Sequence, residues 1–229
     1  LPIVRWDQEM NCLRPLTAAD AFGKLDRLDE RRWHPLVDHM ADVAATFEAL
    51  CHCRSIRRGL EAAAGRPLSE LDIARLTALA FLHDFGKANA GFQAKRWRGD
   101  ERPRNRLTAG HGLEAVALLD AACSGSDEAW GILSRMPVET MAEHWGDSAV
   151  EALLRASIAH HGRPIASMMD WSNVRIHWRE HDGYDPYFQL SRIGEALQAF
   201  VADAFCIDGV LLPDSPRFVH FFAGLVQLA

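Results

Sequence analysis

Apolar residues recur at helical spacing along most of the chain, and this pattern predicts an almost entirely helical protein. The first apolar stripe predicts one amphipathic helix over residues 35–58, and it consists of Leu36, Met40, Val43, Phe47 and Leu50. Pro35 suits the first turn of this helix, because a first turn leaves its N–H groups unpaired in any case. Gly59 suits the end of the helix.

The next apolar stripe predicts a helix that begins at Ser69, whose hydroxyl can cap it, and ends near residue 84, because Gly86 interrupts the pattern. The polar stretch 87–106 contains further glycines and a proline, so we expect a loop or short broken helices there. A short strand is expected over residues 174–178. Further helices are expected over residues 111–122, 147–161, 190–205 and 217–229.

Neither an internal repeat nor a low-complexity tract divides the 229 residues, so we expect a single all-α domain over residues 1–229. Residues 1–30 form an N-terminal extension to which the sequence assigns no role. Hydrophobic residues make up 48% and charged residues 24%, which is ordinary globular composition. No apolar run reaches the roughly 18–20 residues that cross a bilayer, and the first residues lack the pattern of a secretory signal. We therefore expect a cytoplasmic protein without a membrane partner.

The net charge of -6 argues against a protein that coats duplex nucleic acid through a broad basic surface, but it leaves room for a local basic channel. The five cysteines are irregularly spaced, and no second pair accompanies Cys51 and Cys53 at zinc-finger spacing. Reduced thiols are therefore expected.

Five of the eleven histidines lie on the apolar stripes of predicted helices, and these are His39, His83, His111, His160 and His161. Burying so many imidazoles without partners would be costly, and a bound cation removes that cost. Imidazole suits manganese, iron, cobalt, nickel and zinc, and a carboxylate such as Asp84 can bridge two ions. The alternative is that these histidines are structural. His34 lies off the stripe of its helix, so we expect a surface residue or one behind the ligands.

His160 and His161 point about 100° apart on a helix, which favours two ions, or one ion and a histidine that contacts the substrate. Two ions are well suited to in-line attack on a phosphodiester. A His-Asp pair is expected about once by chance in such a sequence, and His181-Asp182 is interpreted as that chance occurrence.

The local sequences around these histidines resemble a known family. HPLVDHMADVA (34–44), FLHDFGKANAGFQ (81–93), GHGLEA (110–115) and IAHHGRP (158–164) are similar to the HD nuclease domain of the type I CRISPR interference nuclease-helicase, within the HD superfamily of metal-dependent phosphohydrolases. The continuation after His83-Asp84 is the most specific of these words. The resemblance covers residues 34–164 and, more weakly, the C-terminal helix.

The resemblance implies a helical HD-type fold that cleaves single-stranded DNA with two divalent transition-metal ions (Mn, Fe, Co, Ni or Zn). Asp84 and Lys87 are the expected catalytic residues, with Lys87 beside the phosphate. The expected metal ligands are His39, His83, Asp84, His111, His160 and His161, with Asp84 shared between the two ions.

The family also has a final metal-binding Asp on a late helix, which is expected just after Ala229, and Asp203 is a weaker internal candidate. We therefore expect the chain to be the N-terminal part of a longer nuclease-helicase. The chain has no G-x-x-x-x-G-K-[ST] motif, so the helicase is expected downstream or on another chain. A CRISPR targeting complex is the further partner that the resemblance implies.

Basic residues crowd the stretch 87–106, and they are Lys87, Lys95, Arg96, Arg98, Arg102, Arg104 and Arg106. Phe92 and Trp97 interleave with them, which suits a path for single-stranded DNA; a solvated loop is the alternative. The expected DNA contacts are Lys95, Arg96, Trp97, Arg98 and Arg104. Two other functions stay open: an HD phosphohydrolase that acts on a nucleotide or cyclic dinucleotide, and a non-catalytic binding module.

Overall fold

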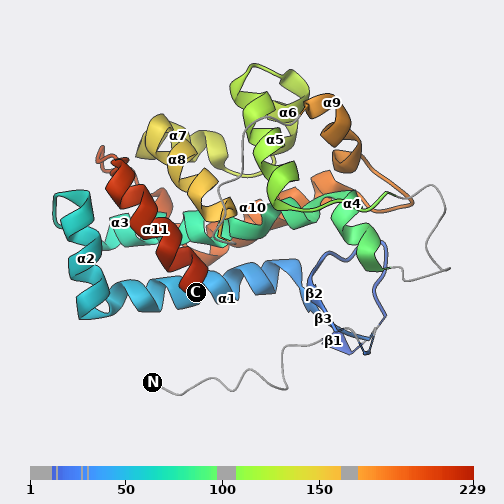
Figure 1. Cartoon of the computed structure of the whole chain (residues 1–229), viewed down its shortest axis with the longest axis horizontal. Helices are drawn as coiled ribbons and strands as arrows, with labels where there is room; N and C mark the ends of the chain where they lie inside the picture. The colour runs from blue at the N-terminus through green and yellow to red at the C-terminus, as the bar shows by residue number, and fades with distance from the viewer. Residues whose placement is uncertain (1–11, 14, 27, 30, 97–106, 161–169) are drawn as a thin grey trace.

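A computed structural model describes residues 12–13, 15–26, 28–29, 31–96, 107–160 and 170–229. Helices make up most of these residues and carry the hydrophobic core, which confirms the prediction of a single all-α domain (Figure 1). The helices in the first half of the chain are α1 (Leu36–His52), α2 (Arg54–Ala64), α3 (Glu70–Phe81), the 3-10 helix η1 (Leu82–Ala88), α4 (Ala90–Gln93) and η2 (Ala94–Arg96). The second half contains α5 (Gly112–Cys123), α6 (Asp127–Leu133), α7 (Val138–Trp145), α8 (Asp147–Ile158), α9 (Trp171–Val174), η4 (Arg175–Trp178), α10 (Pro186–Phe200), η5 (Ala202–Phe205) and α11 (Pro216–Leu228).

A small antiparallel sheet precedes the helices, and the sequence pattern did not predict it. Its strand order is β1-β3-β2, with β1 at Cys12–Leu13, β2 at Phe22–Leu25 and β3 at Arg32–Pro35. The buried side chains of Phe22 and Trp33 pack with Phe92 in a small cluster beside the main core. Since β3 leads directly into α1, the sheet lies next to the start of that helix (Figure 1).

The single helix that was predicted over residues 35–58 is wrong, because it is divided into α1 and α2. Cys53 adopts an extended conformation, with φ -68° and ψ 124°, while its N–H bonds back to the carbonyl of Leu50. Gly59 does not end a helix but lies within α2, where a Cβ would meet the ring of Phe221 at 2.7 Å. The left-handed Gly65 (φ 72°) ends α2 instead.

The start of α3 agrees with the prediction. Ser69 Oγ accepts a hydrogen bond from the Asp72 N–H at 3.0 Å, and the Asp72 carboxylate accepts one from the Ser69 N–H at 2.7 Å. This reciprocal pair is a capping box. The helix α3 then packs against α1 and leads directly into η1, which carries His83 and Asp84.

The strand that was expected over residues 174–178 is also wrong, because α9 and η4 occupy these positions. A half-buried strand would bury every second residue, but Ile176 is 51% exposed while Val174 and Trp178 are buried. This spacing of buried residues is helical, and Asp170 caps the turn by accepting the Ser172 N–H at 2.9 Å.

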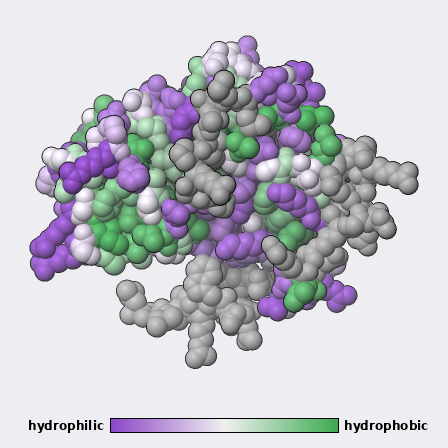
Figure 2. Space-filling view, viewed as in Figure 1, coloured by the Kyte–Doolittle hydropathy of each residue, from purple (hydrophilic) through white to green (hydrophobic). Residues whose placement is uncertain are grey.

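The main core lies between α1, α3, α8 and α11, with η1 packed against α8 and α1. Figure 2 shows polar and apolar residues mixed on one face, with apolar surface near α1, α2 and α11. None of the helices in the described ranges is long and apolar enough to cross a membrane.

Candidate metal centre

The 3-10 helix η1 carries a buried carboxylate. Asp84 interrupts the helical backbone, with φ -117° and ψ 15°, and its side chain is almost completely buried. A glycine is required two residues later, at Gly86, because a Cβ there would overlap the carbonyl oxygen of His111. The turn therefore holds Asp84 against the start of α5.

The two oxygens of Asp84 face two different groups of imidazoles. Oδ2 lies 2.9 Å from His39 Nε2 and 3.2 Å from His83 Nε2. Oδ1 lies 3.2 Å from His111 Nε2 and 3.7 Å from His160 Nε2. Within each group, the atoms that could bind a metal lie within 4.8 Å of one another. The structure thus brings five of the predicted ligand residues together, while His161 lies outside the described residues.

The hydrogen bonds of two histidines fix the nitrogen that faces Asp84. His83 Nδ1 lies 3.0 Å from the carbonyl oxygen of Ala80, and His160 Nδ1 lies 3.1 Å from that of Ser157. Because a carbonyl only accepts hydrogen bonds, both Nδ1 atoms carry the proton in the neutral ring, and both Nε2 lone pairs point at the carboxylate. A lone pair that faces an anionic oxygen is unfavourable unless a proton or a cation lies near both. A hydrogen bond from the other ring nitrogen to a backbone carbonyl, as His83 and His160 make, is typical of metal-binding histidines.

Two polar atoms at this centre are buried without a hydrogen-bond partner among the described residues: Asp84 Oδ1 and His39 Nδ1. Burial favours the neutral acid, but the hydrogen bond from His39 and the positive charge of Lys87 hold the pKa of Asp84 well below its ordinary value. Burial lowers the pKa of His39. A carboxylate beside neutral imidazoles is the protonation state that binds a divalent cation, so the residues present fit such an ion.

Lys87 provides the positive charge nearest to the carboxylate. Its Nζ lies 2.6 Å from Asp84 Oδ2 and donates to the carbonyl of Gly23 in β2 at 3.0 Å. Gly23 also contacts His39, since a Cβ there would lie 2.7 Å from His39 Cβ. The small sheet thereby closes one side of the centre.

The sequence pattern gave no role to Asn89 and Gln93, which are almost completely buried and hydrogen-bonded around η1. A hint was available, because both amides lie in the specific word that follows His83-Asp84. His34 is partly buried behind the centre, where its Nε2 lies 2.8 Å from Asp42 Oδ2 and its ring 6.1 Å from that of His39.

The predicted DNA contacts are only partly described. Trp97, Arg98 and Arg104 lie outside the described residues. The ammonium of Lys95 lies 4.2 Å over the ring of Phe92. Arg96 donates to the backbone carbonyls of the N-terminal segment, at 2.6 Å and 2.8 Å, and thus ties this segment to η2.

Two other candidate residues, Phe92 and Asp203, do not occupy the positions that the sequence pattern predicted for them. The ring of Phe92 is buried against that of His111, with centroids 5.5 Å apart, so it is not an exposed stacking surface. Asp203 is exposed in η5 and belongs to neither group of possible ligands in the described part of the chain.

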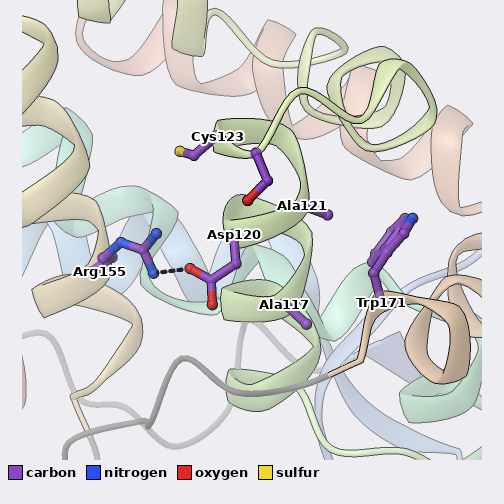
Figure 3. Close-up of a pocket in the computed structure, with 7 residues that line it drawn as sticks. Ala117, Asp120, Ala121, Cys123, Arg155 and Trp171 are labelled. Atoms are coloured by element: carbon purple, nitrogen blue, oxygen red, sulfur yellow. Dashed lines mark ion pairs between the residues drawn. The ribbon is translucent and has the colours of Figure 1, made fainter.

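A surface cavity of about 520 Å³ lies beside α5, α8 and α9, but none of the candidate ligands in the described part of the chain lines it. Figure 3 shows Asp120 and Arg155 pointing toward one another across its wall, and their side chains form an ion pair at 2.6 Å. The cavity is therefore separate from the candidate metal centre.

Comparisons with known proteins place these residues in a wider context. The family model described as "Cas3, HD domain" matches residues 22–229. A protein of Thermus thermophilus, described as "CRISPR-associated endonuclease/helicase Cas3", is 33% identical over 153 residues, which are 66% of this chain and 15% of that protein. A solved structure described as "Crystal structure of CRISPR-associated protein" is similar with a TM-score of 0.53 and 22% identity, over 94% of this chain and 22% of that chain. The similarity to the solved structure shows the fold alone. The chain spans less than a quarter of the length of either relative.

Proposed function

The chain belongs to the Cas3 HD-domain family, and from this premise we propose that it is a metal-dependent nuclease that hydrolyses phosphodiester bonds of single-stranded DNA in type I CRISPR interference. Membership of this family supports a hydrolase with a divalent-metal centre. The choice of single-stranded DNA and the use of two ions belong to the proposal.

One observation carries the proposal: each oxygen of Asp84 faces its own group of imidazole nitrogens. We propose that His39, His83 and Asp84 Oδ2 hold one ion, and that Asp84 Oδ1, His111 and His160 hold another. His161, next to His160 in the chain, is proposed as a further ligand. Divalent ions at such a centre supply activation of water and stabilisation of negative charge on a phosphodiester.

The chain's own residues prepare this centre. The backbone carbonyls of Ala80 and Ser157 hold the rings of His83 and His160 with their Nε2 lone pairs directed inward. Asp84, kept anionic by its neighbours, supplies the negative charge that both groups share. In the proposal, Lys87 stands close enough to Asp84 to place a positive charge beside a bound phosphate.

The proposed strand path runs along the basic stretch that follows α4. Lys95, Trp97, Arg98 and Arg104 are its proposed contacts, with cations for phosphates and an indole ring for a base. Arg96 is less suited to this role, because its guanidinium donates to backbone carbonyls.

We further propose that the chain works with a helicase and a CRISPR targeting complex. The support is that the relative from Thermus thermophilus is described as an endonuclease/helicase and is much longer than this chain.

The test compares Asp84→Asn with Asp182→Asn in cleavage assays with manganese, nickel or cobalt. Both positions follow a histidine, but Asp182 is exposed and has a φ of 49°, which Asn adopts readily. Asp84→Asn is expected to slow cleavage of a linear single-stranded oligonucleotide at least about 100-fold, since it removes several kcal/mol of charge stabilisation. Asp182→Asn is expected to cleave like the unsubstituted protein.

A panel of nucleotides and cyclic dinucleotides is assayed in parallel. Turnover of these compounds without cleavage of DNA would contradict the proposal and favour a small-molecule phosphohydrolase.

A further inference from the structure

Asn89 joins η1 to the chain segment that carries His111. Its side chain is fully buried, and its Nδ2 donates to the carbonyl of Gly86 at 2.7 Å and to that of Gly110 at 2.9 Å. Its Oδ1 accepts the N–H of Phe92 at 2.7 Å and so caps α4. One amide therefore links the turn after Asp84 with the residue before His111.

The same residue before His111 is held from its other side. The N–H of Gly110 donates to Glu114 Oε1 at 2.8 Å, while its carbonyl accepts from Asn89. Both polar atoms of this backbone position are thus fixed, and the direction in which the chain enters α5 is fixed with them.

Gln93 makes a corresponding link on the other side of Asp84. Its Oε1 accepts the N–H of Phe22 at 3.0 Å, and its Nε2 donates to the carbonyl of Phe22 at 3.0 Å and to that of Lys87 at 2.8 Å. The side-chain amide thus pairs with Phe22 as a neighbouring strand would. The next residue in β2 is Gly23, which packs against His39 and accepts from Lys87.

We propose that Asn89 and Gln93 are positioning residues for the two imidazole groups: Asn89 sets the place of His111 relative to Asp84, and Gln93 sets the place of β2 relative to His39 and Lys87. This inference rests on the proposed metal centre. Each amide hydrogen-bonds to backbone groups and acts through the backbone that it holds.

Two substitutions separate this role from simpler ones. Asn89→Ser keeps an oxygen that can cap α4 but cannot span the carbonyls of Gly86 and Gly110. Gln93→Met keeps the length of the side chain and removes its hydrogen bonds. Gln189→Met is the matched control, because Gln189 is also a buried amide that donates to the N-terminal segment, at 2.9 Å to Ala19, from α10.

The readouts are the affinity for Co²⁺, from a titration followed by visible absorption, and the unfolding temperature of the metal-free protein. Asn89→Ser and Gln93→Met are expected to bind cobalt about 10- to 100-fold more weakly, as is typical when a group behind metal ligands is lost. Gln189→Met is expected to lower the unfolding temperature while it keeps the original affinity. The two positions are independent, so one folded variant is sufficient for the test.

Unchanged cobalt affinity in Asn89→Ser and Gln93→Met would overturn the inference, and so would an equal loss of affinity in Gln189→Met. Failure of the unsubstituted protein to bind cobalt would instead contradict the metal centre itself. Failure of the unsubstituted protein to cleave DNA while it binds cobalt would bear on the proposed substrate alone.

Discussion

Gly86 lies where η1 passes the first turn of α5, and the absence of a side chain lets the two backbones touch. A Cβ at this position would overlap the carbonyl oxygen of His111 and lie 2.9 Å from Ala115 Cβ. Gly86→Ala is therefore expected to lower the free energy of unfolding by about 1–3 kcal/mol, because the core is overpacked. It is also expected to move His111 away from Asp84 and to weaken cobalt binding. Urea unfolding and a cobalt titration measure the two effects.

The control is Gly131→Ala in α6, where a Cβ would meet no atom of the described residues within 4 Å. In a helix this change is expected to raise the free energy of unfolding by about 0.5–1 kcal/mol. If Gly86→Ala and Gly131→Ala lowered the free energy of unfolding by the same amount, the packing role of Gly86 would be contradicted.

At this scale the sequence pattern was informative about the histidines. His39 and His83 share the apolar stripes of their helices, so periodicity alone placed their rings in the interior. Asn89 and Gln93 carry no such signal, because a buried amide is recognised only by the backbone groups that it meets. Phe22, which pairs with Gln93, lies far from it in the sequence. Gly110, which accepts from Asn89, lies in a stretch without a regular pattern.

At the scale of single elements, the first turn of α3 contributes a charge that depends on pH. Arg66 contacts both oxygens of Asp72 at 2.8 Å. Burial alone would raise the pKa of Asp72, but the hydrogen bonds from Arg66 and Ser69 outweigh it and lower the pKa below its ordinary value of 3.8. A carboxyl with a lowered folded-state pKa stabilises the fold above its unfolded-state pKa, and this contribution is lost as the pH falls through the folded-state value.

Asp72→Asn is therefore expected to cost about 1–2 kcal/mol of unfolding free energy at neutral pH, where the cap and its charge are complete. The difference from the unsubstituted protein is expected to shrink below about pH 4. Urea unfolding at neutral and acidic pH checks this, and a difference that stays constant over that range would argue against the ion pair.

Capping chemistry is local, which explains why the start of α3 could be predicted from Ser69. The break between α1 and α2 could not, because the apolar stripe continues across Cys53 and no glycine or proline marks the turn. Gly59 was misinterpreted for a related reason: its role depends on Phe221, which comes from the last helix of the chain.

At the scale of the whole molecule, Arg75 binds residues 206–210, which precede α11, to the core. Its fully buried guanidinium donates to the carbonyls of Val210 at 2.7 Å and Cys206 at 2.9 Å, pairs with Asp208 at 2.9 Å, and lies 5.8 Å over the ring of Trp145. Arg75→Met is expected to lower the free energy of unfolding by about 3–5 kcal/mol, since it leaves buried polar partners unpaired. Urea unfolding measures the loss.

Arg58→Met serves as the reference, because Arg58 is exposed in α2. Its effect is expected to stay within about 0.5 kcal/mol. Similar losses at both positions would refute the fastening role of Arg75.

The fold class could be predicted at this scale, because helical periodicity is repeated over many elements. The small sheet could not be, since β1 and β2 are very short and depend on pairing with β3 and on the amide of Gln93. Short strands that are completed by a distant side chain have no period of their own to recognise.

The spread of Asp84's partners along the sequence has a consequence for the order of assembly during synthesis. His39 lies 45 residues before Asp84, whereas His160 follows the end of α8. The backbone of Phe22 pairs with the side chain of Gln93, which comes 71 residues later. Contacts between such distant residues form late, because the intervening chain must first be brought together. A chain still growing on the ribosome therefore cannot complete its imidazole groups until residue 160 has emerged, and the centre matures only after most of the domain has been made.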